Sequence, residues 1–202
     1  VRDRNFSKNN NDELIKWCRG TGLRRKELQE RRGKDKVCRE QSEAEIAQLE
    51  RVTVEKRAPR VIKRLEMLQD ALMFPEGWFI HVRNGKGGRE RLSPIIGKNA
   101  GQIIERISDT PAEETVWQHI HNSADIHGYR AEYATAIYKA HARAIQDIPY
   151  DRVNRGTGKR YQSDVYTCRK DEAGKKLDKA AMLICSKALG HNRISVVADN
   201  YI

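Results

Sequence analysis

The stretch GWFIHVRNGKGGRERLSPII, residues 77–96, decides the fold class of this chain. Two strand-like runs flank the turn sequence NGKGG, and Asn-Gly is a strong signal for a β-hairpin. Most of the remaining chain has the patterns of helices. We therefore expect an α+β fold that is mainly helical and contains a small antiparallel sheet or hairpin.

Helices are predicted on both sides of the hairpin from apolar periodicity and capping residues. Pro59 stands at a natural helix start, and Val61, Leu65, Leu68 and Leu72 follow on one face, which predicts core packing. A first helix is expected to end at Gly20, and Thr21 is a possible N-cap for the next one. The predicted helices cover residues 11–19, a segment from 21 onward, 40–57, 60–73, 99–108, 124–146 and 179–189.

Two C-terminal stretches have features of their own. Residues 150–178 are polar and basic, and a second hairpin is possible around YQSDVYTCRKDEAGKK (161–176). The chain ends with LGHNRISVVADNYI (189–202). Here we expect a loop around Asn192–Ser195 and then a helix starting near Ser195, a reasonable N-cap.

The composition indicates a partner of opposite charge. The chain has 202 residues, with 39 Lys and Arg against 28 Asp and Glu, a net charge of +11 and a pI near 9.6. A nucleic acid or an anionic membrane surface fits this balance, although a solvated basic surface would also produce it. No run approaches 18 apolar residues, so no membrane span is expected.

The cysteines and histidines predict no metal and no disulfide framework. The four cysteines form no CxxC pair, which is typical of a cytosolic protein with free thiols. His119, His121 and His127 lie close in sequence, but no Cys or carboxylate stands at ligand spacing beside them. We expect neither a metal nor another cofactor.

Four short motifs contain the residue types of phosphoryl-transfer chemistry. TGLRRKEL contains Arg24, NGKGGRER contains Lys86, HGYR contains His127 and Arg130, and the final stretch contains His191 and Tyr201. Each motif alone is weak, because an Arg on a helix or a Lys in a Gly-rich turn is usually a solvated surface group.

Taken together and in this order, the motifs resemble the catalytic domain of the tyrosine recombinase (phage integrase) family. The likeness extends from Thr21 to Tyr201. It implies the family's fold over residues 1–202 and a separate helical DNA-gripping domain, which we expect to be missing before Val1 because the chain does not start with Met.

The chemistry of breaking a phosphodiester without metal or ATP fits the same residue types. It needs a nucleophile that stores the bond energy in a covalent link, fixed positive charge around the non-bridging oxygens, and an acid for the leaving 5′-oxygen. The resemblance implies that Tyr201 attacks, that Arg24 and Arg130 clamp the phosphate, and that His191 binds a non-bridging oxygen. It further implies that His127 assists proton movement, that Lys86 is the general acid and that Glu27 orients Arg24.

Two long spacings depart from a compact member of that family. We interpret them as insertions near 33–73, with an extra helical element, and near 150–178. The segment 151–179 has nine Lys or Arg against five acids, which favours contact with DNA, although a solvated insertion is the plain alternative. The expected DNA-binding residues are Arg25, Arg89, Arg91, Lys159, Arg160, Arg169 and Lys170.

The expected function is therefore site-specific recombination, such as integration and excision of a prophage or conjugative transposon. Its partners would be double-stranded DNA, three further copies in a homo-tetramer, and an excisionase or DNA-bending factor, in a bacterial cytoplasm on the nucleoid. Two alternatives remain open: a catalytically silent DNA-binding regulator, and a nicking-closing enzyme like the type IB topoisomerases.

Overall fold

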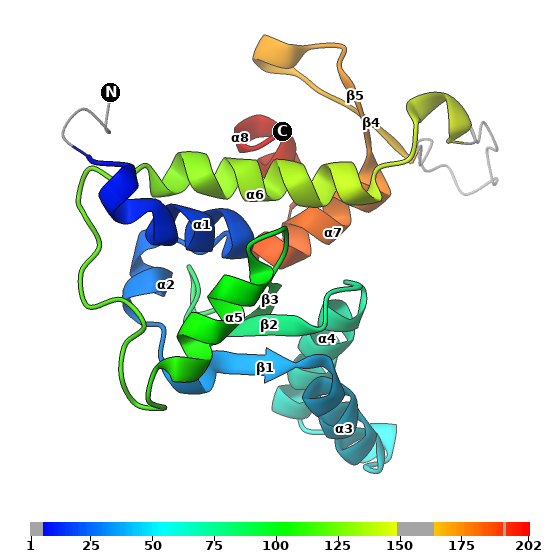
Figure 1. The fold of residues 1–202 in the computed structure, drawn as a ribbon. Coiled ribbons are helices and arrows are strands. Elements are labelled where there is room, and N and C mark those ends of the chain that lie inside the picture. Colours follow the sequence, from blue (N-terminus) through cyan, green and yellow to red (C-terminus); the bar gives the residue numbers. More distant parts are fainter. Residues whose placement is uncertain (1–5, 149–163, 192) are drawn as a thin grey trace.

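The computed structural model describes residues 6–148, 164–191 and 193–202, except for the side chain of Lys170. Within these ranges the chain has the expected α+β architecture, mainly helical with a small antiparallel sheet (Figure 1). None of the described helices is long and apolar enough to cross a membrane.

The predicted hairpin at 77–96 is confirmed and forms the centre of the sheet. Strand β2 (Trp78–Val82) pairs antiparallel with β3 (Arg91–Pro94), with Val82 opposite Arg91 at the loop end. A third strand, β1 (Lys36–Cys38), pairs with the other edge of β2 and was not predicted. Three residues are too few to show strand alternation, so only the pairing with β2 defines this strand.

The sheet separates the two main apolar cores because successive side chains of a strand point to opposite faces. Ile80 and Val82 face a core built with α1 (Asp12–Thr21) and α5 (Ala100–Asp109). Phe79 and Leu92 face a core built with the helices α4 (Pro59–Leu72), α6 (Ile126–His141) and α7 (Lys179–Leu189).

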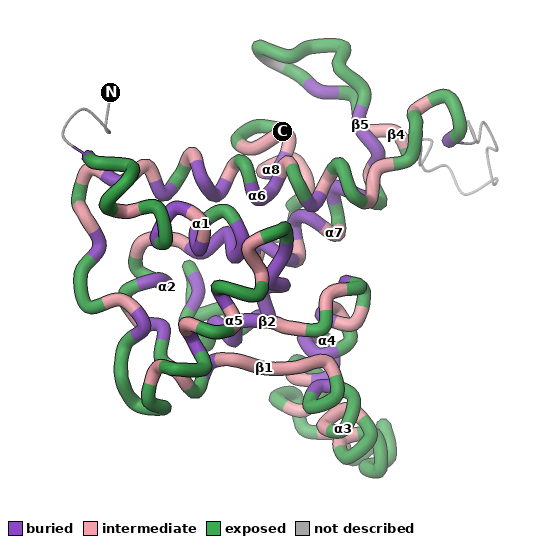
Figure 2. Tube along the Cα trace, in the orientation of Figure 1, coloured by how far each residue is buried: buried purple, intermediate pink, exposed green. Residues whose placement is uncertain are grey.

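The helices follow the predictions except at their ends. The prediction for 40–57 is too long, because α3 (Arg39–Glu50) stops seven residues earlier and only a 3-10 turn, Val54–Lys56, follows. The prediction for 124–146 is also too long, since α6 covers only Ile126–His141. Figure 2 shows α3 largely exposed at one corner of the molecule, whereas α1, α6 and α7 alternate buried and exposed positions.

The boundary between the first two helices differs from the prediction. Thr21 is the last residue of α1, and its hydroxyl donates to the carbonyl of Trp17, so it is not the N-cap of the next helix. Helix α1 is ended instead by Gly22, in the left-handed conformation with φ 59°. Arg24 is the N-cap of α2 (Arg25–Gln29), which places this arginine at the junction of the two helices.

Gly22→Ala is expected to destabilise the protein by about 2 kcal/mol or more, because it combines a left-handed backbone with overpacking. A Cβ at this position would overlap the ring of Tyr133, which is fully buried. Gly101→Ala is the matched control: it lies in α5 with open space around it and should be neutral or mildly stabilising. Thermal melting of both variants measures the difference, and equal melting temperatures would contradict the prediction.

The second hairpin suggested for 161–176 is also present, as β4 (Val165–Thr167) paired antiparallel with β5 (Lys176–Asp178). It projects beyond the body of the domain beside α8 (Ser195–Asn200), the last helix (Figure 1). Helix α8 starts at Ser195 as expected, although the cap position is Ile194.

Candidate active site

Arg130 lies at the centre of the candidate site and joins three segments of the chain. It extends from the first turns of α6, and only 2% of it is exposed. Its Nη1 donates to the carbonyl of Gly22, its Nη2 donates to the carbonyl of Leu189 at 2.6 Å, and its Nε donates to the phenol oxygen of Tyr201 at 3.2 Å. The end of α1, the end of α7 and the end of α8 therefore meet at one guanidinium.

The same guanidinium keeps capacity for an anion. Arginine has five N–H donors, and these three bonds leave one on each terminal nitrogen. Burial, followed by the nearby charges of Arg91 and Arg24, lowers the Arg130 pKa to about 10. The group is therefore still charged at neutral pH, and its burial would strengthen its interaction with any anion that reached it.

Tyr201 follows α8, and two backbone hydrogen bonds and two ring contacts hold it. Its backbone N–H donates to the carbonyl of Val197 at 3.0 Å, and its own carbonyl accepts a bond from the Thr135 hydroxyl at 3.0 Å. Its ring centroid lies 5.5 Å from that of His127 and 5.6 Å from that of His191. The structure thus brings together the two predicted histidines, the predicted tyrosine and Arg130, although they are far apart in sequence.

His191 follows Gly190, the residue after the end of α7. Gly190, in the left-handed conformation, caps that helix, and the backbone N–H of His191 donates to the carbonyl of Ser186 at 2.8 Å. Burial first, and then the charges of Arg130, Arg24, Arg91 and Arg89, lower the His191 pKa to about 4. Its Nε2 is buried, and no hydrogen-bond partner for it exists among the described residues.

A titration of His191 by NMR should therefore give a pKa of about 4, below the ordinary value of 6.5. The unfolded chain would take up this proton near pH 6.5 and the folded chain would not. The contribution to stability is thus present above pH 6.5 and is lost as the pH falls toward 4. His191→Gln should remove this part of the pH dependence of unfolding, and a pKa of 6.5 in the folded protein would contradict the prediction.

Arg24 is held through Glu27. The Glu27 carboxylate accepts from the backbone N–H of Arg24 at 2.9 Å and from its guanidinium at 2.8 Å. Burial of Glu27 opposes its ionisation, but hydrogen bonds and charge from Arg91, with further bonds from Arg24, outweigh it and lower the Glu27 pKa to about 2. The carboxylate is ionised at every pH near neutrality and orients both arginines.

Arg91 has a structural position that the sequence did not reveal. Its expected contact with DNA stays a prediction, and the residue is only 5% exposed. Its guanidinium binds Glu27 with two bonds of 2.8 and 3.0 Å and donates to the carbonyl of Ala188 at 3.1 Å. It links β3 to α2 and α7, and so ties the Arg24 segment to the segment that leads to His191.

Lys86 is exposed in the loop between β2 and β3. Its neighbour Gly85 lies against the Glu27–Arg91 pair: a Cβ there would be 3.1 Å from Nη1 of Arg91 and 3.4 Å from the Glu27 carboxylate. The start of the lysine loop is therefore packed beside the residues that hold Arg24. Among the described residues, no hydrogen bond or ion pair joins Lys86 to Tyr201 or Arg130, and loop residues of this kind are commonly mobile.

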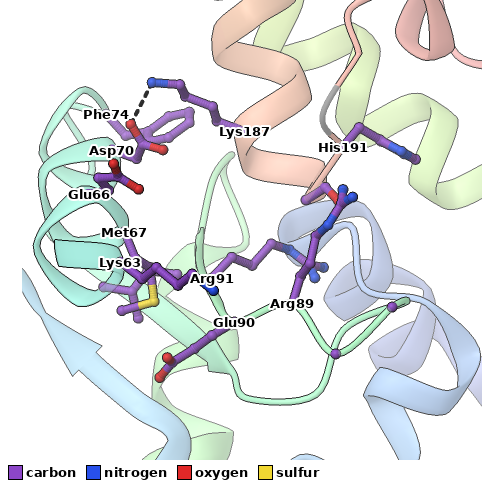
Figure 3. A pocket seen from close by; sticks show the side chains of 14 residues that line it. Lys63, Glu66, Met67, Asp70, Phe74, Arg89, Glu90, Arg91, Lys187 and His191 are labelled. Atoms are coloured by element: carbon purple, nitrogen blue, oxygen red, sulfur yellow. Dashed lines mark hydrogen bonds and ion pairs between the residues drawn. The ribbon is translucent and has the colours of Figure 1, made fainter. Parts of the chain in front are cut away.

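A cavity of about 660 Å³ opens beside this loop, between α4, β3 and the end of α7. His191 and Arg89 lie at one end, and Lys187 crosses to Asp70 with a bond of 2.5 Å at the other (Figure 3). Its lining combines charged side chains with the apolar side chains of Met67, Phe74 and Leu92.

The other predicted DNA contacts fall in three groups. Arg25 donates to the carbonyls of His121, Asn122 and Ala124, so it holds the protein's own loop. Arg89 and Arg169 are exposed, and contact with DNA stays a prediction for both. Lys159 and Arg160 lie outside the described residues, as does the side chain of Lys170.

Two features of the site had no signal in the sequence. Thr135 fixes the Tyr201 backbone, but a threonine within a helix is not diagnostic of anything. Arg91 follows the hairpin loop, where an arginine is usually exposed.

Among the described residues, no three His, Cys, Asp or Glu side chains gather closely enough to hold a metal ion.

No protein-family model, no curated protein and no solved structure matches this chain. Assignment of a function therefore depends on the motifs and on the geometry of the residues described above.

Proposed function

We propose that this protein is a site-specific tyrosine recombinase that cuts and rejoins duplex DNA through a 3′-phosphotyrosyl intermediate. One observation supports this most: the Tyr201 phenol is hydrogen-bonded to the buried Arg130 guanidinium at 3.2 Å and flanked by two histidines. A tyrosine that only packs in a core does not need a buried arginine (Arg130) and a neutral histidine (His191) beside its phenol.

In the proposed reaction the Tyr201 oxygen forms a bond to the scissile phosphorus, and the bond from phosphorus to the 5′-oxygen breaks. The phenol proton leaves with the help of His127, and Lys86 gives a proton to the 5′-oxygen. Arg130 and Arg24 stabilise the charge that develops on the non-bridging oxygens. Attack by a 5′-hydroxyl from another strand on the phosphotyrosine reverses these steps: it releases Tyr201 and rejoins the DNA.

The neutral state of His191 fits this scheme. With a pKa of about 4, its imidazole has one N–H donor and one acceptor at neutral pH. The buried Nε2 can then hydrogen-bond a non-bridging oxygen, and the negative charge of a bound phosphate would raise the pKa again. Glu27 would serve as a positioning residue for Arg24 and take no part in proton transfer.

The wider expectations belong to the same proposal. The excess of basic residues would bind the DNA backbone, and the protein would act as a tetramer on two attachment sites of a prophage or conjugative element. An excisionase or DNA-bending factor would bias the direction of the reaction. The extra segments near 33–73 and 150–178 would be additions to a compact catalytic domain.

The proposal is tested by covalent capture on DNA. Purified protein is incubated with a pool of nicked duplexes that cover the DNA beside its gene, where an integrase usually has its attachment site. An adduct that resists denaturation, is linked through Tyr201 in mass spectrometry and forms on one sequence supports the proposal. Relaxation of supercoiled DNA without site preference would favour the topoisomerase-like alternative. Absence of any adduct, with DNA still bound, would favour the silent regulator.

Lys86→Ala is expected to slow cleavage of ordinary DNA by about 10²-fold or more, the usual contribution of a general acid. The defect should largely disappear on a substrate whose leaving 5′-oxygen is replaced by sulfur, because a thiolate leaves without a proton. Single-turnover cleavage of both substrates makes the comparison. Equal defects on the two substrates would exclude Lys86 as the acid.

A further inference from the structure

The proposed nucleophile, Tyr201, follows a helix that is too short to be stable by itself. Helix α8 has six residues, Ser195–Asn200, far below the length at which an isolated helix is stable in water. Its position must therefore come from tertiary contacts. On one side Val197 is fully buried in the core formed with α6 and α7. Its other side needs a second support.

The β4–β5 hairpin supplies that support through a small apolar cluster. Leu177 is 3% exposed and Cys168 is 5% exposed, and with Met182 of α7 they form a core separate from the two main ones. Three residues at the ends and on one face of α8 pack against this cluster. They are Ile194, Ala198 and Ile202, which bracket Tyr201 in sequence. Lys175 of the hairpin also donates to the Ile202 carbonyl at 3.2 Å.

The base of the hairpin is in turn fixed to the helix that contains Arg130. Asp178, fully buried at the end of β5, accepts two bonds of 2.8 Å from the Arg143 guanidinium and one from its backbone N–H. The backbone N–H of Asp178 donates to the hydroxyl of Tyr138 in α6 at 3.0 Å. The same carboxylate caps α7 through the N–H of Ala180.

These contacts connect α6, the β4–β5 hairpin and α8 to one another in a ring. Helix α6 holds the hairpin through Tyr138, the hairpin holds α8, and α8 places Tyr201 against Thr135 and Arg130 of α6. We infer that the β4–β5 hairpin is a positioning element that holds Tyr201 in line for attack within its own chain. This inference rests on the proposed function. It assigns to the described part of the basic 150–178 segment a role in positioning the nucleophile, beyond the DNA contact expected from its charge.

Leu177→Ala tests the inference by removing a buried hairpin side chain from the cluster against which α8 packs. The matched control is Lys176→Ala, because Lys176 precedes it on the same strand and is exposed. Three quantities are measured: amide hydrogen exchange in residues 194–202, single-turnover adduct formation, and DNA affinity. A displacement of about 1 Å at a nucleophile can cost about 10²-fold in rate, so a loss of roughly 10- to 100-fold in adduct formation is expected.

The expected pattern is specific to positioning. Leu177→Ala should speed exchange in 194–202 by about tenfold or more, leave exchange in α6 as in the wild type, and leave DNA affinity nearly unchanged. Leu177→Met, which keeps the volume, should restore both exchange protection and rate. Unchanged exchange in 194–202, an unchanged adduct rate, or a parallel loss of rate and DNA affinity would each overturn the inference.

A second variant covers the case in which Leu177→Ala lacks a cooperative melting transition. Ala198→Glu places a charge in the same contact from the α8 side and keeps good helix propensity. It should give the same exchange and rate pattern, and wild-type values would overturn the inference. Failure of the proposed function is distinguishable. If wild-type protein forms no adduct on DNA that it binds, the recombinase proposal fails, whereas exchange in 194–202 still shows whether the hairpin supports α8.

Discussion

Tyr201→Phe should reduce formation of the covalent protein–DNA adduct to below detection while leaving DNA affinity almost unchanged. Only the hydroxyl takes part in the proposed chemistry, and no other described group replaces it. The ring would stay where it is, because it packs against the core of α6 and α7 and its backbone carbonyl is bound by Thr135. Arg130 would keep its bonds to the carbonyls of Gly22 and Leu189, so the phosphate site would remain formed.

The measurement is an adduct assay on nicked DNA, together with a binding titration and a melting curve. Tyr166→Phe is the matched control, since this half-buried tyrosine lies in β4 and its ring packs against the hairpin cluster. It should cleave at close to the wild-type rate. Adduct formation by Tyr201→Phe would remove Tyr201 from the role of nucleophile and would leave the recombinase proposal without its central residue.

Arg130→Ala should lower the rate of strand cleavage by about 10²-fold or more, as expected when a buried donor to a developing oxyanion is removed. Weak non-specific DNA binding should fall only slightly, because the chain has 39 Lys and Arg in total. The same substitution would also raise the pKa of His191, since the Arg130 charge is the second cause that lowers it after burial.

Loss of stability must be separated from loss of chemistry in this variant. Arg130→Ala would leave the buried carbonyls of Gly22 and Leu189 without their donor, and such groups cost about 1–3 kcal/mol each. Cleavage is therefore compared well below the melting temperature, and Arg130→Lys is included because it keeps the charge but loses the planar fork. Arg19→Ala is the control, since that exposed arginine of α1 pairs with Glu132 of α6, the helix that contains Arg130. Wild-type cleavage by Arg130→Ala would exclude it from the site.

The sequence alone was sufficient for the fold class and for most elements. The Asn-Gly turn at 84–85 predicted the β2–β3 hairpin, and Pro59 with its apolar stripe predicted α4 almost to the residue. These signals are local: a turn needs particular backbone angles, and a buried helix face needs apolar residues at helical spacing. The helix ends were less well predicted: Gly22 rather than Gly20 ends α1, and the ring of Tyr133 packs against Gly22.

The candidate site was predicted in part for the same reason. Motif order indicated Arg130, His191 and Tyr201, which the structure brings into contact or close proximity. The sequence could not distinguish Arg91, which is buried against Glu27, from Arg89, which is exposed two residues earlier. Arg89 lies in the loop and Arg91 is the first residue of β3. The partners that hold Arg91 inward are distant in sequence: Glu27 is 64 residues away and Ala188 is 97 residues away.

Local patterns thus indicated which residues are candidates for a site, and long-range packing determined how they are held. The pattern of the chain predicted an α+β fold, a net basic charge and a set of candidate side chains with a late tyrosine. Tertiary structure alone decided that β1 joins the sheet, that Thr135 holds the Tyr201 backbone, and that the β4–β5 hairpin packs on α8. The physical reason is that a six-residue helix and a three-residue strand have too little local stability to specify their own position, so distant contacts fix both.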